Sequence, residues 1–124
     1  MMFETGALSG DLLDWAVVHA LNAPEMEEAW LRDRKRGYPH SFSRDWDKGG
    51  WLVEQCVKNG MLLESVDPQY REKMPLFKAS LNKWESIFRS DTILEVTCRT
   101  YVGHKLGECF DIPNEIVALF QPPQ

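Results

Sequence analysis

Residues 9–21 of this 124-residue chain, Ser-Gly-Asp-Leu-Leu-Asp-Trp-Ala-Val-Val-His-Ala-Leu, decide how the fold begins. Ser9 suits the N-cap of a helix, and Asp11 falls in the first turn, where the helix dipole favours an acid. Apolar residues recur at helical spacing, namely Leu12, Leu13, Ala16, Val17 and Ala20. The stretch therefore predicts an amphipathic helix, which ends before Pro24.

The rest of the chain alternates helical and extended patterns. Helices are predicted at 24–36, 46–58 and 91–106, strands at 61–66 and 76–84, and an extended piece with a helical turn at 108–117. Since two strands make an unstable sheet, we expect a third from the irregular segments. The expectation is an α+β fold, in which a small antiparallel sheet is packed between helices as an α-β-α sandwich.

Length and composition favour one small acidic domain. Residues 1–120 are expected to form it, with a charged helical insertion at 24–37 and a frayed tail at 121–124. Lys and Arg number 14 against 19 Asp and Glu, a net charge of −5, which argues against a protein that coats DNA. From the pattern of apolar and basic residues we expect neither a membrane span nor a signal peptide. Three cysteines without a CxxC pair indicate reduced thiols and a cytoplasmic location.

The five tryptophans divide into two predicted groups. Trp15, Trp51 and Trp84 are expected in the core, whereas Trp30 and Trp46 are expected to be available for binding. The division matters because exposed tryptophan rings suit interfaces and flat ligands.

Three stretches resemble one known family. Residues 9–17, the segment Ser-Arg-Asp-Trp-Asp-Lys-Gly-Gly-Trp-Leu-Val-Glu at 43–54 that follows Tyr38, and Cys-Arg-Thr-Tyr-Val-Gly-His-Lys-Leu-Gly-Glu at 98–108 resemble motifs of the NinX-like family. That family consists of small phage and prophage proteins of uncharacterised function. The layout is more distantly similar to phage α-β-α sandwich proteins, which include sponges that sequester the nucleotide signals of Thoeris immunity.

The more distant resemblance implies a function. It implies an oligomeric phage protein in the bacterial cytoplasm that counters host defence by binding a cyclic ADP-ribose-type or cyclic nucleotide signal without cleaving it. In those proteins basic residues of the final helix face the ligand. Arg99 lies at a comparable position here, and His104 and Lys105 are nearby substitutes for a second base.

Residues around the start of helix 46–58 make up the rest of the candidate site. The candidate ligand-binding residues are Tyr38, Ser43, Trp46, Lys48 and Arg99. Rings would hold a flat base, while Ser43, backbone N–H groups and the cations would hold phosphate. A purely structural interpretation stays open: Asp45 is an N-cap, Trp46 packs on its helix, Gly49-Gly50 allows close packing, and Arg99 pairs with Glu95 one turn earlier.

The sequence carries no recognisable catalytic or metal-binding motif. The spacing of Cys98, His104 and Cys109 matches no zinc pattern, and no catalytic triad, P-loop or dinucleotide fingerprint is present. We therefore expect a non-enzymatic protein without a cofactor. The alternative function is a protein-binding inhibitor or adaptor that uses the charged segment around Trp30 against a host or phage protein, with the basic run at 32–36 as a second possible contact.

Overall fold

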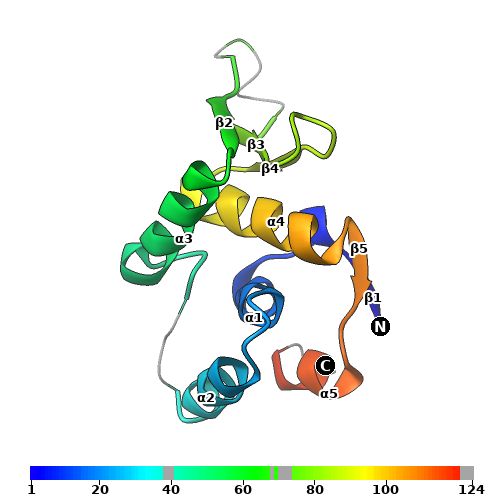
Figure 1. Ribbon diagram of the computed structural model, residues 1–124. Coiled ribbons are helices and arrows are strands. Elements are labelled where there is room, and N and C mark those ends of the chain that lie inside the picture. The colour runs from blue at the N-terminus through cyan, green and yellow to red at the C-terminus, as the bar shows by residue number, and fades with distance from the viewer. Residues whose placement is uncertain (38–40, 68, 70–73, 121–124) are drawn as a thin grey trace.

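The computed structural model describes residues 1–37, 41–67, 69 and 74–120, and it has the expected α+β class (Figure 1). The helices are α1 (Gly10–Ala20), α2 (Pro24–Lys35), α3 (Trp46–Lys58), α4 (Ile93–Leu106) and α5 (Asn114–Phe120). The strands are β1 (Met2–Glu4), β2 (Leu62–Ser65), β3 (Phe77–Ser80), β4 (Phe88–Ser90) and β5 (Cys109–Asp111). The predicted tail at 121–124 lies outside the described residues.

The strands form two small antiparallel sheets. β1 pairs with β5, which joins the first and last parts of the described chain, and the other sheet has the order β2-β3-β4. The predicted strand 76–84 is too long, because the chain turns after Ser80. The Ser80 hydroxyl accepts hydrogen bonds from the backbone N–H groups of Asn82 and Trp84, both at 3.1 Å, and Trp84 has a left-handed φ of 70°. After the turn β4 supplies the expected third strand.

Helix α1 lies at the centre of the fold rather than on its surface. α2, α4 and α5 all contact it, and α4 separates it from the three-stranded sheet (Figure 1). Besides the predicted apolar residues, Asp14, Trp15 and Val18 of α1 are also buried. We expected an amphipathic helix with one buried face, and this prediction is wrong. Other helices pack on several faces of α1, so most of its side chains are buried.

Capping residues set the start of α3 and the end of α4 where the sequence predicts them, whereas the Ser9 side chain at the start of α1 makes no capping hydrogen bond. The Asp45 carboxylate accepts from Asp47 N at 3.0 Å, and Gly107 ends α4 with a φ of 94°. α4 begins two residues later than expected, since the Thr92 hydroxyl caps it, accepting from Glu95 N at 3.1 Å. Within the described residues no helix is both long and apolar enough to cross a bilayer.

Burial of the tryptophans differs from the prediction at three of five positions. Trp15 is buried and Trp46 is 59% exposed, as expected. Trp30 is only 5% exposed, because α2 packs on α1 and the Trp30 ring meets Phe120 of α5 edge-on at 5.6 Å. Trp51 is 48% exposed, and Trp84 is half-buried beneath the Lys78 ammonium. Trp30 is therefore part of the core, and Trp51 is available for binding.

Candidate functional site

The start of α1 and the segment that enters α3 fold onto each other around Asp14. This buried carboxylate accepts hydrogen bonds from the Ser41 hydroxyl at 2.7 Å and from Ser43 N at 2.9 Å. Arg44 reaches both Asp14 and Asp11, at 3.4 and 3.0 Å, and Arg34 of α2 also pairs with Asp11 at 2.7 Å. Ser43 is therefore buried in a structural contact between α1 and the segment that enters α3.

The structure separates the residues predicted to bind a ligand. Tyr38 lies outside the described residues, Ser43 is buried, and Trp46 lies exposed at the start of α3. Lys48 lines a pocket between α1, α2 and α3, while Arg99 lines a different one beside β4 and β5. The four described residues of this set, Ser43, Trp46, Lys48 and Arg99, therefore do not line one common pocket.

Arg99 is held by protein groups on three sides. Its guanidinium donates to the Leu8 carbonyl at 2.8 Å and to the Arg89 carbonyl, and it pairs with Glu95 at 3.1 Å. The side chain is 14% exposed. These contacts confirm the predicted pair with Glu95 and show that Arg99 also ties α4 to β4 and to the loop before α1.

A different site lies between α3 and α4, and we call it the α3–α4 pocket. Its volume is about 320 Å³. Trp51 and Gln55 of α3 and Asn59, the residue that caps its end, recur every four residues on one side. Tyr101, His104 and Lys105 face them from α4. Four other residues complete the lining: Leu21, Leu52, Cys56 and Leu81. Residues three or four apart lie on the same face of a helix, so these side chains of α3 and α4 form opposite walls of one pocket.

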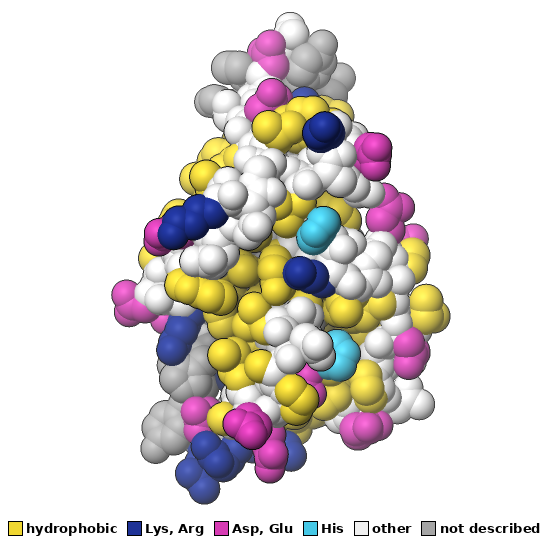
Figure 2. Space-filling model, viewed as in Figure 1, with side chains coloured by type: hydrophobic (Ala, Val, Ile, Leu, Met, Phe, Trp, Pro, Cys, Tyr) yellow, Lys and Arg dark blue, Asp and Glu magenta, His cyan; other side chains and the backbone are white. Residues whose placement is uncertain are grey.

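The α3–α4 pocket is positively charged in a protein of net charge −5. Among the described residues that line it, none is acidic, whereas Lys105 and His104 both stand at its α4 wall. The Lys105 ammonium lies 6.0 Å from the centre of the Tyr101 ring. Figure 2 shows two histidines with a lysine between them beside a broad apolar area on this face. The pocket can therefore attract an anion next to aromatic surface.

The thiol and phenol beside this pocket are neutral at physiological pH. Burial raises the pKa of Cys56 to about 11. Burial also raises the pKa of Tyr101, and the negative charge of an ionised Cys56 would raise it further. Deeper in the core, burial raises the pKa of Cys98 well above its usual value, with Asp14 adding to the effect. A protonated thiol is a weak nucleophile, so Cys56 and Cys98 are poorly suited to covalent chemistry.

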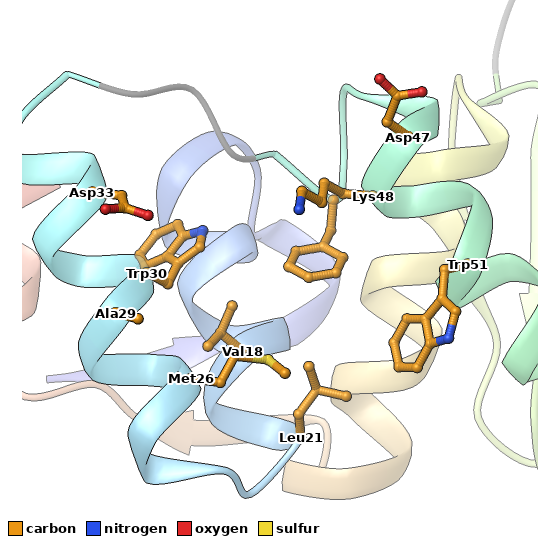
Figure 3. A pocket seen from close by; sticks show the side chains of 10 residues that line it. Val18, Leu21, Met26, Ala29, Trp30, Asp33, Asp47, Lys48 and Trp51 are labelled. Atoms are coloured by element: carbon orange, nitrogen blue, oxygen red, sulfur yellow. The ribbon is translucent and has the colours of Figure 1, made fainter.

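The pocket between α1, α2 and α3, called the apolar pocket below, has a volume of about 440 Å³. Trp30 and Trp51 stand on its opposite walls, with Val18 and Leu21 of α1 between them (Figure 3). Leu21 and Trp51 line both this pocket and the α3–α4 pocket. The two pockets are therefore neighbours along one face of the protein.

Sequence reasoning missed Trp51, Gln55 and Tyr101 as site residues and treated His104 and Lys105 as substitutes. The available signal was the spacing of Trp51, Gln55 and Asn59, which places a ring and two amides on one helix face. Within the described residues no group of three or more His, Cys, Asp or Glu side chains is placed to hold a metal ion. No protein-family model, curated protein or solved structure matches this chain.

Proposed function

We propose that this protein binds a small anionic ligand with a flat ring, of the nucleotide type, in the α3–α4 pocket and sequesters it without chemical change. One observation carries the proposal: the pocket combines two aromatic rings, two amides and two basic side chains, and none of its described lining residues is acidic. As a phage accessory protein in the bacterial cytoplasm, it would lower the concentration of a host immune signal such as a cyclic nucleotide or a cyclic ADP-ribose.

Each part of a nucleotide has a suitable partner in this pocket. Trp51, which is 48% exposed, and Tyr101 offer ring faces for a base. The Gln55 amide both donates and accepts, so it can pair with the edge of a base. Lys105 and His104 can donate to phosphate oxygens. Because acids elsewhere give the protein its negative charge, this local excess of basic groups favours one small anion rather than a nucleic acid.

Sequestration rather than turnover is favoured by the chemistry around the pocket. Its one cysteine, Cys56, has a raised pKa and stays protonated at neutral pH. The phenol of Tyr101 likewise stays protonated, so neither group serves as a general base. The proposed function therefore requires only tight binding of the ligand. A homo-oligomer would carry several such binding sites at once.

A ligand screen with product analysis tests the proposal. Cyclic ADP-ribose isomers and cyclic di- and trinucleotides are incubated with the protein, and binding is measured by thermal shift and calorimetry. Mass spectrometry of the ligand released by heating follows. We expect at least one compound to bind at micromolar concentration and to be recovered with its mass unchanged. A recovered ligand of altered mass would instead indicate a hydrolase, and no binding by any compound would refute the proposal.

Protein binding is a second candidate function, favoured by an exposed apolar stripe on α3. Trp46 is 59% exposed and Val57 54% exposed, and the partly buried Gly50 and Val53 lie between them at helical spacing. The sequence suggested Trp30 in the charged segment as the contact residue, but Trp30 is buried and does not serve this role. A stoichiometric partner from host lysate that is lost with Trp46→Ala and kept with Lys105→Gln would favour this function. Loss of the partner with Lys105→Gln alone would argue against it.

A further inference from the structure

The apolar pocket is a second hollow whose character differs from that of the α3–α4 pocket. Its walls are chiefly aliphatic and aromatic, and its polar lining is limited to three charged residues among those described, Asp33, Asp47 and Lys48. Its volume of about 440 Å³ lies within the range of about 300 to 1,000 Å³ that is usual for small-molecule sites. The pocket is therefore large enough for a small ligand with an apolar body. The charged residues at its edge determine which charge that ligand should carry.

Of these three charged groups, Lys48 extends over the cavity, Asp33 borders it beside Trp30, and Asp47 points away from it (Figure 3). The Lys48 ammonium extends towards α2. Asp33 lies on the α2 wall, and its carboxylate is 4.0 Å from the Arg32 guanidinium. Within the described part of the chain, no carboxylate lies within ion-pair distance of Lys48. A cation with no ion-pair partner among the described residues thus faces an apolar cavity.

We infer that the apolar pocket binds a small organic carboxylate with an aliphatic or aromatic body. The body would lie among Val18, Leu21, Met26 and the two tryptophans, and the carboxylate would accept hydrogen bonds from the Lys48 ammonium. Met26, which is 49% exposed on the α2 wall, has a flexible side chain that adapts to bodies of different shape. This activity is separate from nucleotide binding and does not depend on it.

The charge of the ligand is the property that this site should select. Octanoate, octanamide and octylamine share nearly the same body and differ in charge, so they form a matched series of probes. A charge-assisted hydrogen bond at an exposed lysine is expected to favour octanoate over octanamide by about tenfold, and octylamine should bind most weakly. Raised salt should reduce the preference for octanoate, because the Lys48 head group is exposed to solvent.

Calorimetry and ligand-detected NMR with four variants test the inference. Lys48→Gln should bring octanoate down to the level of octanamide, and Lys48→Glu should reverse the preference towards octylamine. Ala29→Phe fills the pocket and should abolish binding of all three probes. Lys105→Gln, which lies in the α3–α4 pocket, should leave octanoate binding unchanged. Circular dichroism of each variant checks its folding, and Lys48→Glu keeps the test valid if Ala29→Phe does not fold.

The inference is overturned if octanoate binds less than about twofold better than octanamide, or if its preference survives Lys48→Gln. It is also overturned if the probes fail to saturate below about 5 mM, a weak affinity for so large a cavity. Nucleotide binding is measured in the same variants. Its failure with intact octanoate binding would refute the proposed function alone, and the converse result would refute this inference alone.

Discussion

Asp14 is the residue on which the junction between α1 and the segment before α3 depends. Its buried carboxylate accepts from the Ser41 hydroxyl and Ser43 N, and it faces the Arg44 guanidinium at 3.4 Å. A buried carboxylate needs such donors, because an unpaired charge in the protein interior is strongly destabilising. The contact also gives a structural reason for Asp14 in α1 and for the Ser41 hydroxyl that donates to it.

Asp14→Asn is expected to lower the free energy of unfolding by about 1 to 3 kcal/mol. The amide keeps the shape of the side chain but loses the negative charge, and its NH2 group faces donors instead of acceptors. Urea unfolding measures the change. Asp11→Asn is the matched control: Asp11 is partly exposed, and its loss should cost about 1 kcal/mol or less. Equal losses in the two variants would contradict the role given to Asp14.

Cys56 makes stability depend on pH at the alkaline end. Burial raises its pKa from 9.0 in the unfolded chain to about 11 in the folded protein, so the folded state holds the thiol proton more tightly. The free energy of unfolding should therefore fall as pH rises from about 9 to 11, by at most about 1.4 kcal/mol per pH unit for this group. Urea titrations across this range should show a smaller decline in Cys56→Ala. An identical decline in both proteins would show that Cys56 is not the cause.

At the scale of elements, the helices were predictable and the strands were less so. Caps and breakers such as Asp45 and Gly107 act locally, so the sequence places α3 and the end of α4 correctly. The strands are only three or four residues long, and their ends depend on contacts across the sheet and on the turn after Ser80. Those interactions join segments that are distant in sequence, and a local sequence pattern carries no information about them.

Two adjacent glycines of α3 give a matched test of helix packing. A Cβ on Gly49 would collide with the Phe42 carbonyl and lie 2.7 Å from Leu94 Cδ2, whereas a Cβ on Gly50 would be 3.5 Å from the Trp46 ring. Gly49→Ala should therefore destabilise the protein by about 1 to 3 kcal/mol, as overpacking does. Gly50→Ala should be neutral or stabilise it by up to about 1 kcal/mol through helix propensity. Thermal unfolding of both variants measures this difference, and a stable Gly49→Ala protein would contradict the α3–α4 packing.

For the molecule as a whole, the class of the fold was accessible from the sequence, but the grouping of side chains into pockets was not. Lys48 and Arg99 belong to different pockets, and Arg99 is occupied by Glu95 and two backbone carbonyls. The α3–α4 pocket joins Trp51 to Lys105 across more than fifty residues of sequence, and only the packing of two helices brings them together. Burial of Trp30 and exposure of Trp51 follow from the same tertiary arrangement, since α2 covers the core and α3 leaves one face open.

We propose that the α3–α4 pocket holds the anionic ligand, and calorimetry on Lys105→Gln gives the sharpest test of this claim. For the tightest-binding cyclic nucleotide or cyclic ADP-ribose, loss of this cation should weaken affinity by about tenfold or more. Lys58→Gln makes the same change of charge on α3 outside the pocket, where Lys58 pairs with Glu54, and should leave affinity within about twofold of wild type. Equal affinity in wild type and Lys105→Gln, with both proteins folded, would contradict the claim.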